Sequence, residues 1–100
     1  MKELSELQDW YAAHCDGEWE HRCGVRIETL DNPGWQITID LTGTELEGFA
    51  LPRTRREDGD HDWLEYEVTN GKFVAAGDAL KLTVLLTVFE QFVTANAPRL

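Results

Sequence analysis

Alternation of apolar and polar residues on both sides of a proline–glycine turn constrains the fold of this chain more than any other feature. Residues 25–30 place Val, Ile and Thr in alternation with Arg, Glu and Leu, and residues 35–41 repeat the pattern. Successive side chains of a strand point to opposite faces, so both runs predict half-buried strands. Asn32-Pro33-Gly34 predicts a type II turn, because proline fixes φ and glycine admits positive φ. The inward residues of the second strand are then Trp35, Ile37, Ile39 and Leu41.

A second hairpin is predicted where Asn70-Gly71 separates residues 63–69 from residues 72–76. Asparagine and glycine both tolerate the positive φ of a type I′ turn, which suits a two-residue hairpin loop. The pattern before this hairpin is weaker. Phe49 and Leu51 suggest a short strand, which Pro52 limits to an edge or bulged position. Three arginines then lead into a polar turn over residues 57–62.

Two helical patterns flank the strands. In the first, Ser5 and Gln8 form a capping-box pattern, and Gly17 can take the left-handed conformation that ends a helix. Its apolar side repeats at steps of three and four residues, at Leu4, Leu7, Trp10, Tyr11 and His14.

The second helix is predicted over residues 79–95, with Asp78 as its N-cap. Its main stripe consists of Leu82, Leu85, Leu86, Phe89, Phe92 and Val93, and Val84 and Val88 widen it. A helix, four to five antiparallel strands and a helix predict an α+β fold with both helices on one sheet face.

The length of the chain predicts a single domain over residues 1–100, large enough for one core with 42% hydrophobic residues. No apolar run approaches the roughly 20 residues that a membrane helix needs, so no membrane partner is expected. The first residues show no apolar signal-peptide segment, which predicts a cytoplasmic protein. We expect a monomer or a weak homodimer.

The charge of the chain is strongly negative and unevenly placed. The formal net charge is −10, and residues 1–67 hold seventeen acids and six bases, whereas residues 68–100 hold two acids and three bases. Such a field repels nucleic-acid phosphates, so nucleic-acid binding is not expected. It would attract a basic protein such as a nuclease and increase the association rate. Solubility alone is the alternative explanation.

One cluster offers an alternative function as a small metal- or ligand-binding domain, namely His14, Cys15, His21 and Cys23. Zinc sites usually contain ligand pairs two to four residues apart, and these cysteines form no such pair. We expect two reduced thiols and no cofactor. Asp58, Asp60 and Asp62 match the first ligands of an EF-hand loop, but later positions of that loop do not fit.

The sequence contains no motif typical of a catalytic site. There is no Gly-x-Ser-x-Gly, phosphate-binding glycine loop or His-Glu-x-x-His, so no enzyme activity is expected. Two tryptophans remain ambiguous. Trp19 either covers the core or faces a partner. Trp63 lies in phase with Glu65 and Glu67, which places it on the wet face unless the strand starts later and Trp63 folds inward.

Two longer strings resemble a known family. Cys-Asp-Gly-x-Trp-Glu-His over residues 15–21 and Glu-Thr-Leu-Asp-Asn-Pro-Gly-Trp over residues 28–35 are similar to the immunity protein 53 family. The resemblance covers nearly the whole chain and implies a protein that binds and neutralises a bacterial polymorphic toxin. The matching positions are Asp16, Gly17, Trp19, Glu20, His21, Glu28, Leu30, Asp31, Asn32, Pro33, Gly34, Trp35, Trp63, Gly71 and Phe73. The chain departs from the pattern at Arg22-Cys23 and at Ala76-Gly77-Asp78.

The expected toxin-binding surface is the sheet face that the helices leave open. Trp63, Glu65 and Glu67 form its centre, and Asp58, Asp60 and Asp62 form its rim. A large aromatic beside carboxylates suits a hot spot against a basic partner. The second choice is the loop that contains Asp16, Glu18, Trp19 and Glu20.

Overall fold

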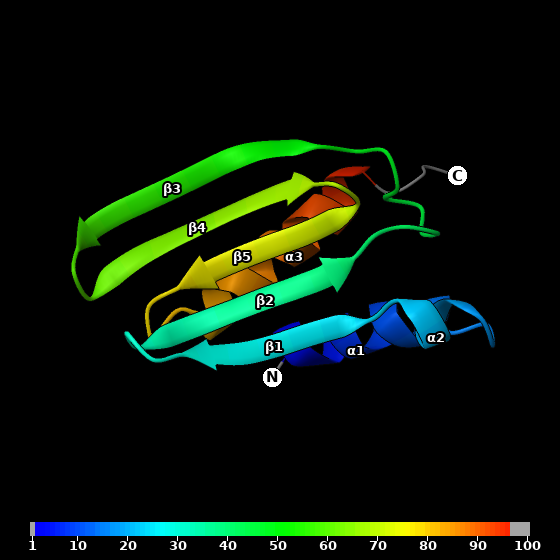
Figure 1. Ribbon diagram of the computed structural model, residues 1–100, viewed down its shortest axis with the longest axis horizontal. Coiled ribbons are helices and arrows are strands. Elements are labelled where there is room, and N and C mark those ends of the chain that lie inside the picture. The colour runs from blue at the N-terminus through cyan, green and yellow to red at the C-terminus, as the bar shows by residue number, and fades with distance from the viewer. Residues whose placement is uncertain (1, 97–100) are drawn as a thin grey trace.

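One open antiparallel sheet of five strands forms the centre of the computed structural model, which describes residues 2–96 (Figure 1). The strands lie side by side in the order β1-β2-β5-β4-β3. Their bounds are β1 Val25–Leu30, β2 Gly34–Asp40, β3 Leu51–Gly59, β4 Asp62–Thr69 and β5 Lys72–Gly77. The helices of this part of the chain are α1 Lys2–His14, α2 Trp19–Arg22 and α3 Leu82–Asn96. The predicted α+β fold is confirmed.

Both predicted hairpins are present, and they meet where β2 pairs with β5 in the middle of the sheet. Asn70 and Gly71 have φ angles of 54° and 74°, as a type I′ turn between β4 and β5 requires. Ile37, Ile39 and Leu41 are fully buried, as expected.

The prediction of a type II turn before β2 is wrong. Gly34 is already the first residue of β2 and does not have a positive φ. Its lack of a side chain serves another purpose, since a Cβ atom there would collide with the carbonyl oxygen of Gly77 on β5. Close approach of two backbones therefore requires this glycine.

The short strand predicted around Phe49 and Leu51 is longer in the structure, where β3 extends through the arginines to Gly59. The polar turn predicted over residues 57–62 is therefore reduced to Asp60 and His61 between β3 and β4. Strand β3 lies at the edge of the sheet, and its pairing with β4 shifts between Leu51 and Thr54. Pro52 occupies that irregularity, so the prediction of an edge or bulged position is confirmed. Most side chains of β3 are exposed, which is why no apolar alternation revealed the strand.

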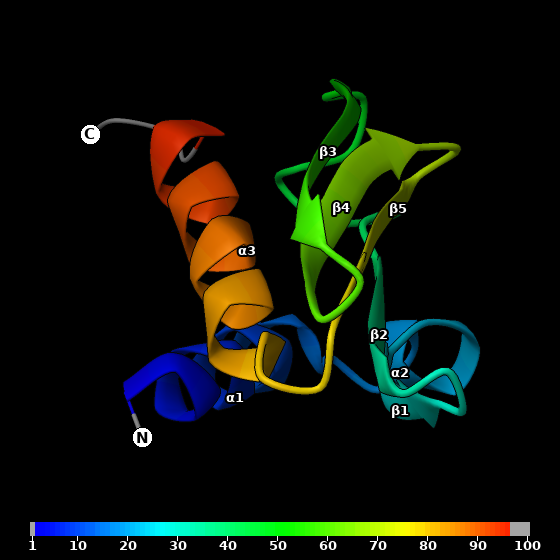
Figure 2. The same ribbon diagram turned by 90° about the vertical axis from the view of Figure 1, so that its left-hand side faces the viewer.

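The helices α1 and α3 lie together on one side of the sheet (Figure 2). They enclose a core with the inward residues of β2, β4 and β5. The buried apolar residues are Leu7, Trp10, Trp19, Ile37, Ile39, Leu41, Leu46, Leu64, Val68, Phe73, Ala75, Leu85, Leu86, Phe89 and Phe92.

The first helix differs from its prediction at both ends. It begins at Lys2, so Ser5 lies inside the helix and cannot cap it. It ends at His14, while Gly17 takes a φ of 96° in the loop that follows. Of its predicted apolar side, Leu7 and Trp10 are buried, whereas Leu4 and Tyr11 are exposed. The side of α1 that meets the core is thus narrower than expected.

The last helix begins at Leu82, so Asp78 is not its N-cap. Asp78 is 4% exposed and its carboxylate accepts hydrogen bonds from the backbone N–H groups of Trp63 and Leu80. The Lys81 ammonium also donates to it, at 2.7 Å. The residue therefore fixes the connection between β5 and α3 to the start of β4. Val84 was expected to widen the apolar stripe, but it is exposed.

Candidate functional site

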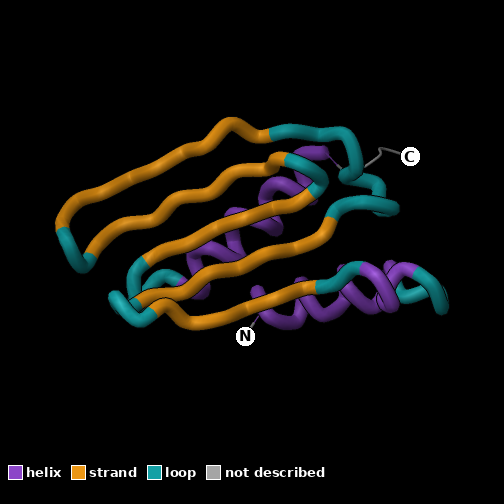
Figure 3. Tube along the Cα trace, in the orientation of Figure 1, coloured by secondary structure: helices purple, strands orange, loops and turns teal. Residues whose placement is uncertain are grey.

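The two groups of residues predicted to bind a partner lie at opposite ends of the sheet (Figure 3). The turn between β3 and β4, with Asp60, is at one end, and the loop between α1 and α2, with Asp16, is at the other. The two groups of residues therefore do not form one continuous patch, and each is treated as a separate candidate surface.

The centre of the first candidate lies on the outer face of β4. Leu64 and Val68 are 7% and 2% exposed and face the core, whereas Trp63, Glu65 and Glu67 alternate with them and are half-buried. The alternative in which Trp63 folds into the core is therefore wrong. We call Trp63, Glu65, Glu67 and their neighbour Arg55 on β3 the outer-face cluster.

Arginines of the edge strand pair with the carboxylates of this cluster. Arg53 and Arg55 donate to the two carboxylate oxygens of Glu65 at 2.6 and 2.8 Å. Arg55 also donates to Glu57 at 2.6 Å. Its hydrogen bond to Glu57 is the main cause that raises the pKa of Arg55 above its ordinary value. The centre of the face is thus charge-paired. This pairing was not predicted, because the strand expected around Phe49 and Leu51 was too short to include the arginines.

The three aspartates at the rim occupy different positions. Asp58 belongs to β3, Asp60 to the turn and Asp62 to the start of β4, and all three are exposed. Asp62 forms an ion pair of 2.7 Å with Lys81. The Lys81 side chain is 19% exposed, and Asp58 and Asp62 line a small pocket with it and with Val84. These two acids therefore lie at the end of the sheet on the side of α3.

In the second candidate, two acids hold the loop in shape. The backbone N–H groups of Glu18 and Trp19 donate to Asp16 Oδ1, both at 2.9 Å. Those of Asp16 and Gly17 donate to the carboxylate of Glu20 at 3.0 and 2.8 Å. The hydrogen bonds from Trp19 and Glu18 lower the pKa of Asp16 below its ordinary value. These reciprocal hydrogen bonds explain why the string Asp-Gly-x-Trp-Glu has an acid at each end: both acids fix the shape of the loop.

Trp19 belongs to the core and does not form an exposed anchor. It is 6% exposed, and its indole Nε1 donates to the carbonyl oxygen of Thr42 at 2.9 Å. Its ring lies edge-on to Trp10, with centroids 6.0 Å apart. Glu18 is exposed beside it. Of the two alternatives predicted for Trp19, the structure therefore shows the one in which it covers the core.

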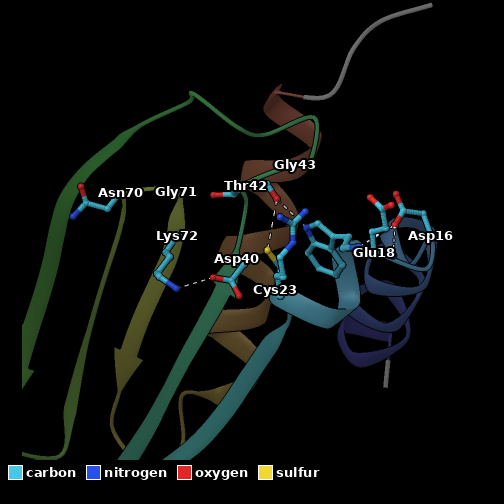
Figure 4. A pocket seen from close by; sticks show the side chains of 11 residues that line it. Asp16, Glu18, Cys23, Asp40, Thr42, Gly43, Asn70, Gly71 and Lys72 are labelled. Carbon is cyan, nitrogen blue, oxygen red and sulfur yellow. Dashed lines mark hydrogen bonds and ion pairs between the residues drawn. The ribbon is translucent and has the colours of Figure 1, made fainter.

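A polar pocket of about 420 Å³ opens between α2 and the ends of β2 and β5 (Figure 4). Lys72 Nζ donates to Asp40 Oδ1 at 2.7 Å on one side of it, and Asp40 Oδ2 accepts from the backbone N–H of Gly24 at 2.9 Å. Cys23 also lines this pocket. Asp40 and Lys72 are thus engaged with each other. Three further charged residues, Asp16, Glu18 and Arg22, also line the pocket.

The four residues of the alternative metal site do not form one. His14 contacts the carbonyl oxygen of Trp10 at 2.7 Å through one ring nitrogen and Glu45 at 2.6 Å through the other. Cys15 Sγ donates to the carbonyl oxygen of Tyr11, and both cysteines are free thiols. Within residues 2–96, no three potential metal-ligating side chains lie together. Both ring nitrogens of His14 are thus engaged, one within α1 and the other with the loop after β2.

The molecule is thus a small α+β domain with one open sheet face, on which arginines of the edge strand pair with Glu65. The family model described as immunity protein 53 matches residues 4–94, and the chain belongs to this family. Membership supports an immunity function in general, which implies binding to a toxin partner. No curated protein and no solved structure matched the chain. In the described part of the chain, no helix has the length and apolar character that crossing a membrane requires.

Proposed function

We propose that this protein neutralises a cognate basic toxin, such as a nuclease, by covering it with the outer face of its sheet. Family membership supports toxin binding in general. The location is supported by one observation above all: Trp63 stands half-exposed on the face opposite α1 and α3, with the guanidinium of Arg55 over its ring. Tryptophan and arginine are the residue types most enriched among interface hot spots.

The outer-face cluster has the composition of an interface centre. Ion pairs from Arg53 and Arg55 hold Glu65 in one position, so little side-chain entropy would be lost when a partner covers it. Glu67 lies on the same face of β4, two residues after Glu65. The rim carries Asp58 and Asp60, which would face the basic groups of the toxin.

Charge supports the basic character of the proposed partner. A net charge of −10 on 100 residues gives long-range attraction toward a cationic protein and repulsion from nucleic acid. The centre of the outer face is charge-paired, so we assign the long-range attraction toward the toxin to the net charge of the whole molecule. We assign the specificity of binding to Trp63 and Arg55. Inhibition would then result from steric occlusion of the toxin.

The test uses the toxin domain encoded by the neighbouring gene, purified alone. Its affinity for the wild-type protein is measured by calorimetry and compared with Trp63→Ala and with Asp31→Ala, an exposed change in the turn between β1 and β2. We expect loss of affinity in the first variant and wild-type affinity in the second. Unchanged affinity in a folded Trp63→Ala protein would exclude the outer face as the binding surface.

A further inference from the structure

A groove between α1 and α3 lies on the helical side of the molecule, away from the outer face of the sheet. Its volume is about 270 Å³, and its apolar walls include Leu7 and Trp10 from α1 and Leu86 and Phe89 from α3. Ligand pockets for drug-sized molecules usually measure about 300–1,000 Å³. The groove is therefore suited to one side chain of a partner.

Three carboxylates line the same groove, those of Glu3, Glu6 and Glu90. Glu6 Oε2 is buried, and no N–H group or hydroxyl of the described residues donates to it, so its available partner is the carboxyl group of Glu90 when that group is protonated. Lys2 reaches the other oxygen of Glu6 at 3.7 Å, but its side chain is 77% exposed. The hydrogen bond with Glu6 is the main cause that raises the pKa of Glu90, and burial and repulsion from Glu6 add to it. Two carboxyl groups thus crowd together above an apolar floor.

The aromatic floor is fixed in place. Trp10 Nε1 donates to Glu45 Oε1 at 3.2 Å, and the Trp10 ring lies edge-on to Phe89 with centroids 5.1 Å apart. A cation placed between the carboxylates would gain charge-assisted hydrogen bonds from both. Its aliphatic stem would cover Leu7 and Leu86. Arginine fits best, because its planar guanidinium can donate to two carboxylates at once and stack on an aromatic ring.

We propose that the groove between α1 and α3 binds an arginine side chain of a basic partner protein, held by Glu6 and Glu90 above Trp10 and Leu86. Charge complementarity argues for this occupant: an apolar side chain would remove water from Glu6 and Glu90 without supplying a donor, and an acidic one would add a fourth carboxylate to the three that line the groove. A second copy of this chain, with its net charge of −10, would be repelled. The inference does not depend on the outer face being the toxin-binding surface.

The test titrates isotope-labelled protein by NMR with acetyl-Ala-Arg-Ala-amide, and with the same peptide carrying citrulline, which has the shape of arginine without its charge. We expect saturable shifts at Leu7, Trp10 and Leu86 with the arginine peptide and none with the citrulline peptide. In the same titration, the pKa of the Glu90 carboxyl should fall toward its ordinary value, since a bound cation favours its charged form.

Variants identify the groups responsible. Glu6→Gln and Glu90→Gln keep the size of the side chains and should each weaken binding of the arginine peptide about tenfold. Asp9→Asn, an exposed change on the same helix with the same loss of charge, is the control and should bind as the wild type does. Equal binding of both peptides would overturn the proposal, as would shifts spread over the acids of the β3–β4 turn or unchanged affinity in both glutamine variants. A negative result with the arginine peptide would not change the outcome expected for toxin binding by the Trp63→Ala variant. The two proposals are therefore tested separately.

Discussion

The guanidinium of Arg55 lies 5.2 Å from the centroid of the Trp63 ring, so a residue of the edge strand holds the large aromatic of its neighbour in place. Arg55 can do this because Glu57 and Glu65 anchor it on both sides. Removal of either tryptophan or arginine would therefore change the surface without opening the core. Variants at Trp63 and Arg55 can therefore distinguish a loss of toxin affinity from a loss of stability.

Trp63→Ala should cost about 2 kcal/mol or more of toxin-binding free energy, as loss of a hot-spot residue does. The fold should survive, because Trp63 lies on the face away from the core. Calorimetry with the toxin and thermal unfolding of the free protein measure the two effects. Trp19→Ala is the matched comparison: it should destabilise the protein by about 3–5 kcal/mol, since Trp19 is buried. A clearly lower unfolding temperature in Trp63→Ala, with unchanged toxin affinity in the folded fraction, would contradict the assignment.

Charge reversal at Glu67 should weaken binding to a basic toxin while leaving stability nearly unchanged. Glu65→Lys should weaken binding as well, but it should also lower the unfolding temperature, because it removes two ion pairs and places a third cation beside Arg53 and Arg55. Stopped-flow binding and thermal melts on both variants distinguish these effects. Wild-type toxin affinity in both variants would show that the outer face makes no contact with the toxin.

Local sequence signals predicted the parts of the fold that short-range chemistry determines. The Asn70-Gly71 turn and the alternation around Ile37 and Ile39 depend on residues that are neighbours in the chain, and both are confirmed. The extent of β3 could not be predicted, because an edge strand buries few side chains and shows no periodicity. For the same reason, the strand predicted around Phe49 and Leu51 did not extend to the arginines.

The candidate site was predictable only where it depends on strand alternation. That rule placed Trp63, Glu65 and Glu67 on one face, which is confirmed. It could not show that Arg53 and Arg55 neutralise Glu65, since this pairing depends on the register of β3 against β4. Nor could it show that Asp16 and Glu20 bind backbone N–H groups, although a carboxylate beside a glycine in a short loop is a recognisable signal for such capping.

Asp78→Asn should lower the free energy of unfolding by about 2 kcal/mol at neutral pH, because a buried charged acceptor of three hydrogen bonds is lost. The hydrogen bond from Lys81 lowers the pKa of Asp78 from 3.8 to about 2. A lowered folded-state pKa contributes stability above pH 3.8 that is lost as the pH falls toward 2. The difference between wild type and variant should therefore shrink over that range in urea titrations. Asp58→Asn, an exposed change, should show no such trend.

Asp16→Ala should destabilise the loop between α1 and α2 while leaving toxin binding intact. Each backbone hydrogen bond that Asp16 accepts is worth about 1 kcal/mol, so the loss of two gives about 2 kcal/mol. Hydrogen exchange at Glu18 and Trp19 reports on the loop directly. Glu18→Ala is the control, because this exposed side chain lies beside the same loop. A large loss of affinity in Glu18→Ala would instead make this loop the binding surface.

The association rate with a basic toxin should fall about tenfold or more as salt rises from about 0.02 M to 0.5 M, whereas the dissociation rate should change little. The reason is that the Debye length is about 8 Å at physiological ionic strength, so attraction between separated charges is screened. Surface plasmon resonance across a salt series measures both rates. The paired variants Asp58→Asn/Asp60→Asn and Glu3→Gln/Asp9→Asn remove the same charge from the rim of the outer face and from α1. The first pair should reduce the salt dependence more, because the toxin would approach the β3–β4 turn. An association rate that does not respond to salt would mean that the acidic surplus of this chain serves solubility alone.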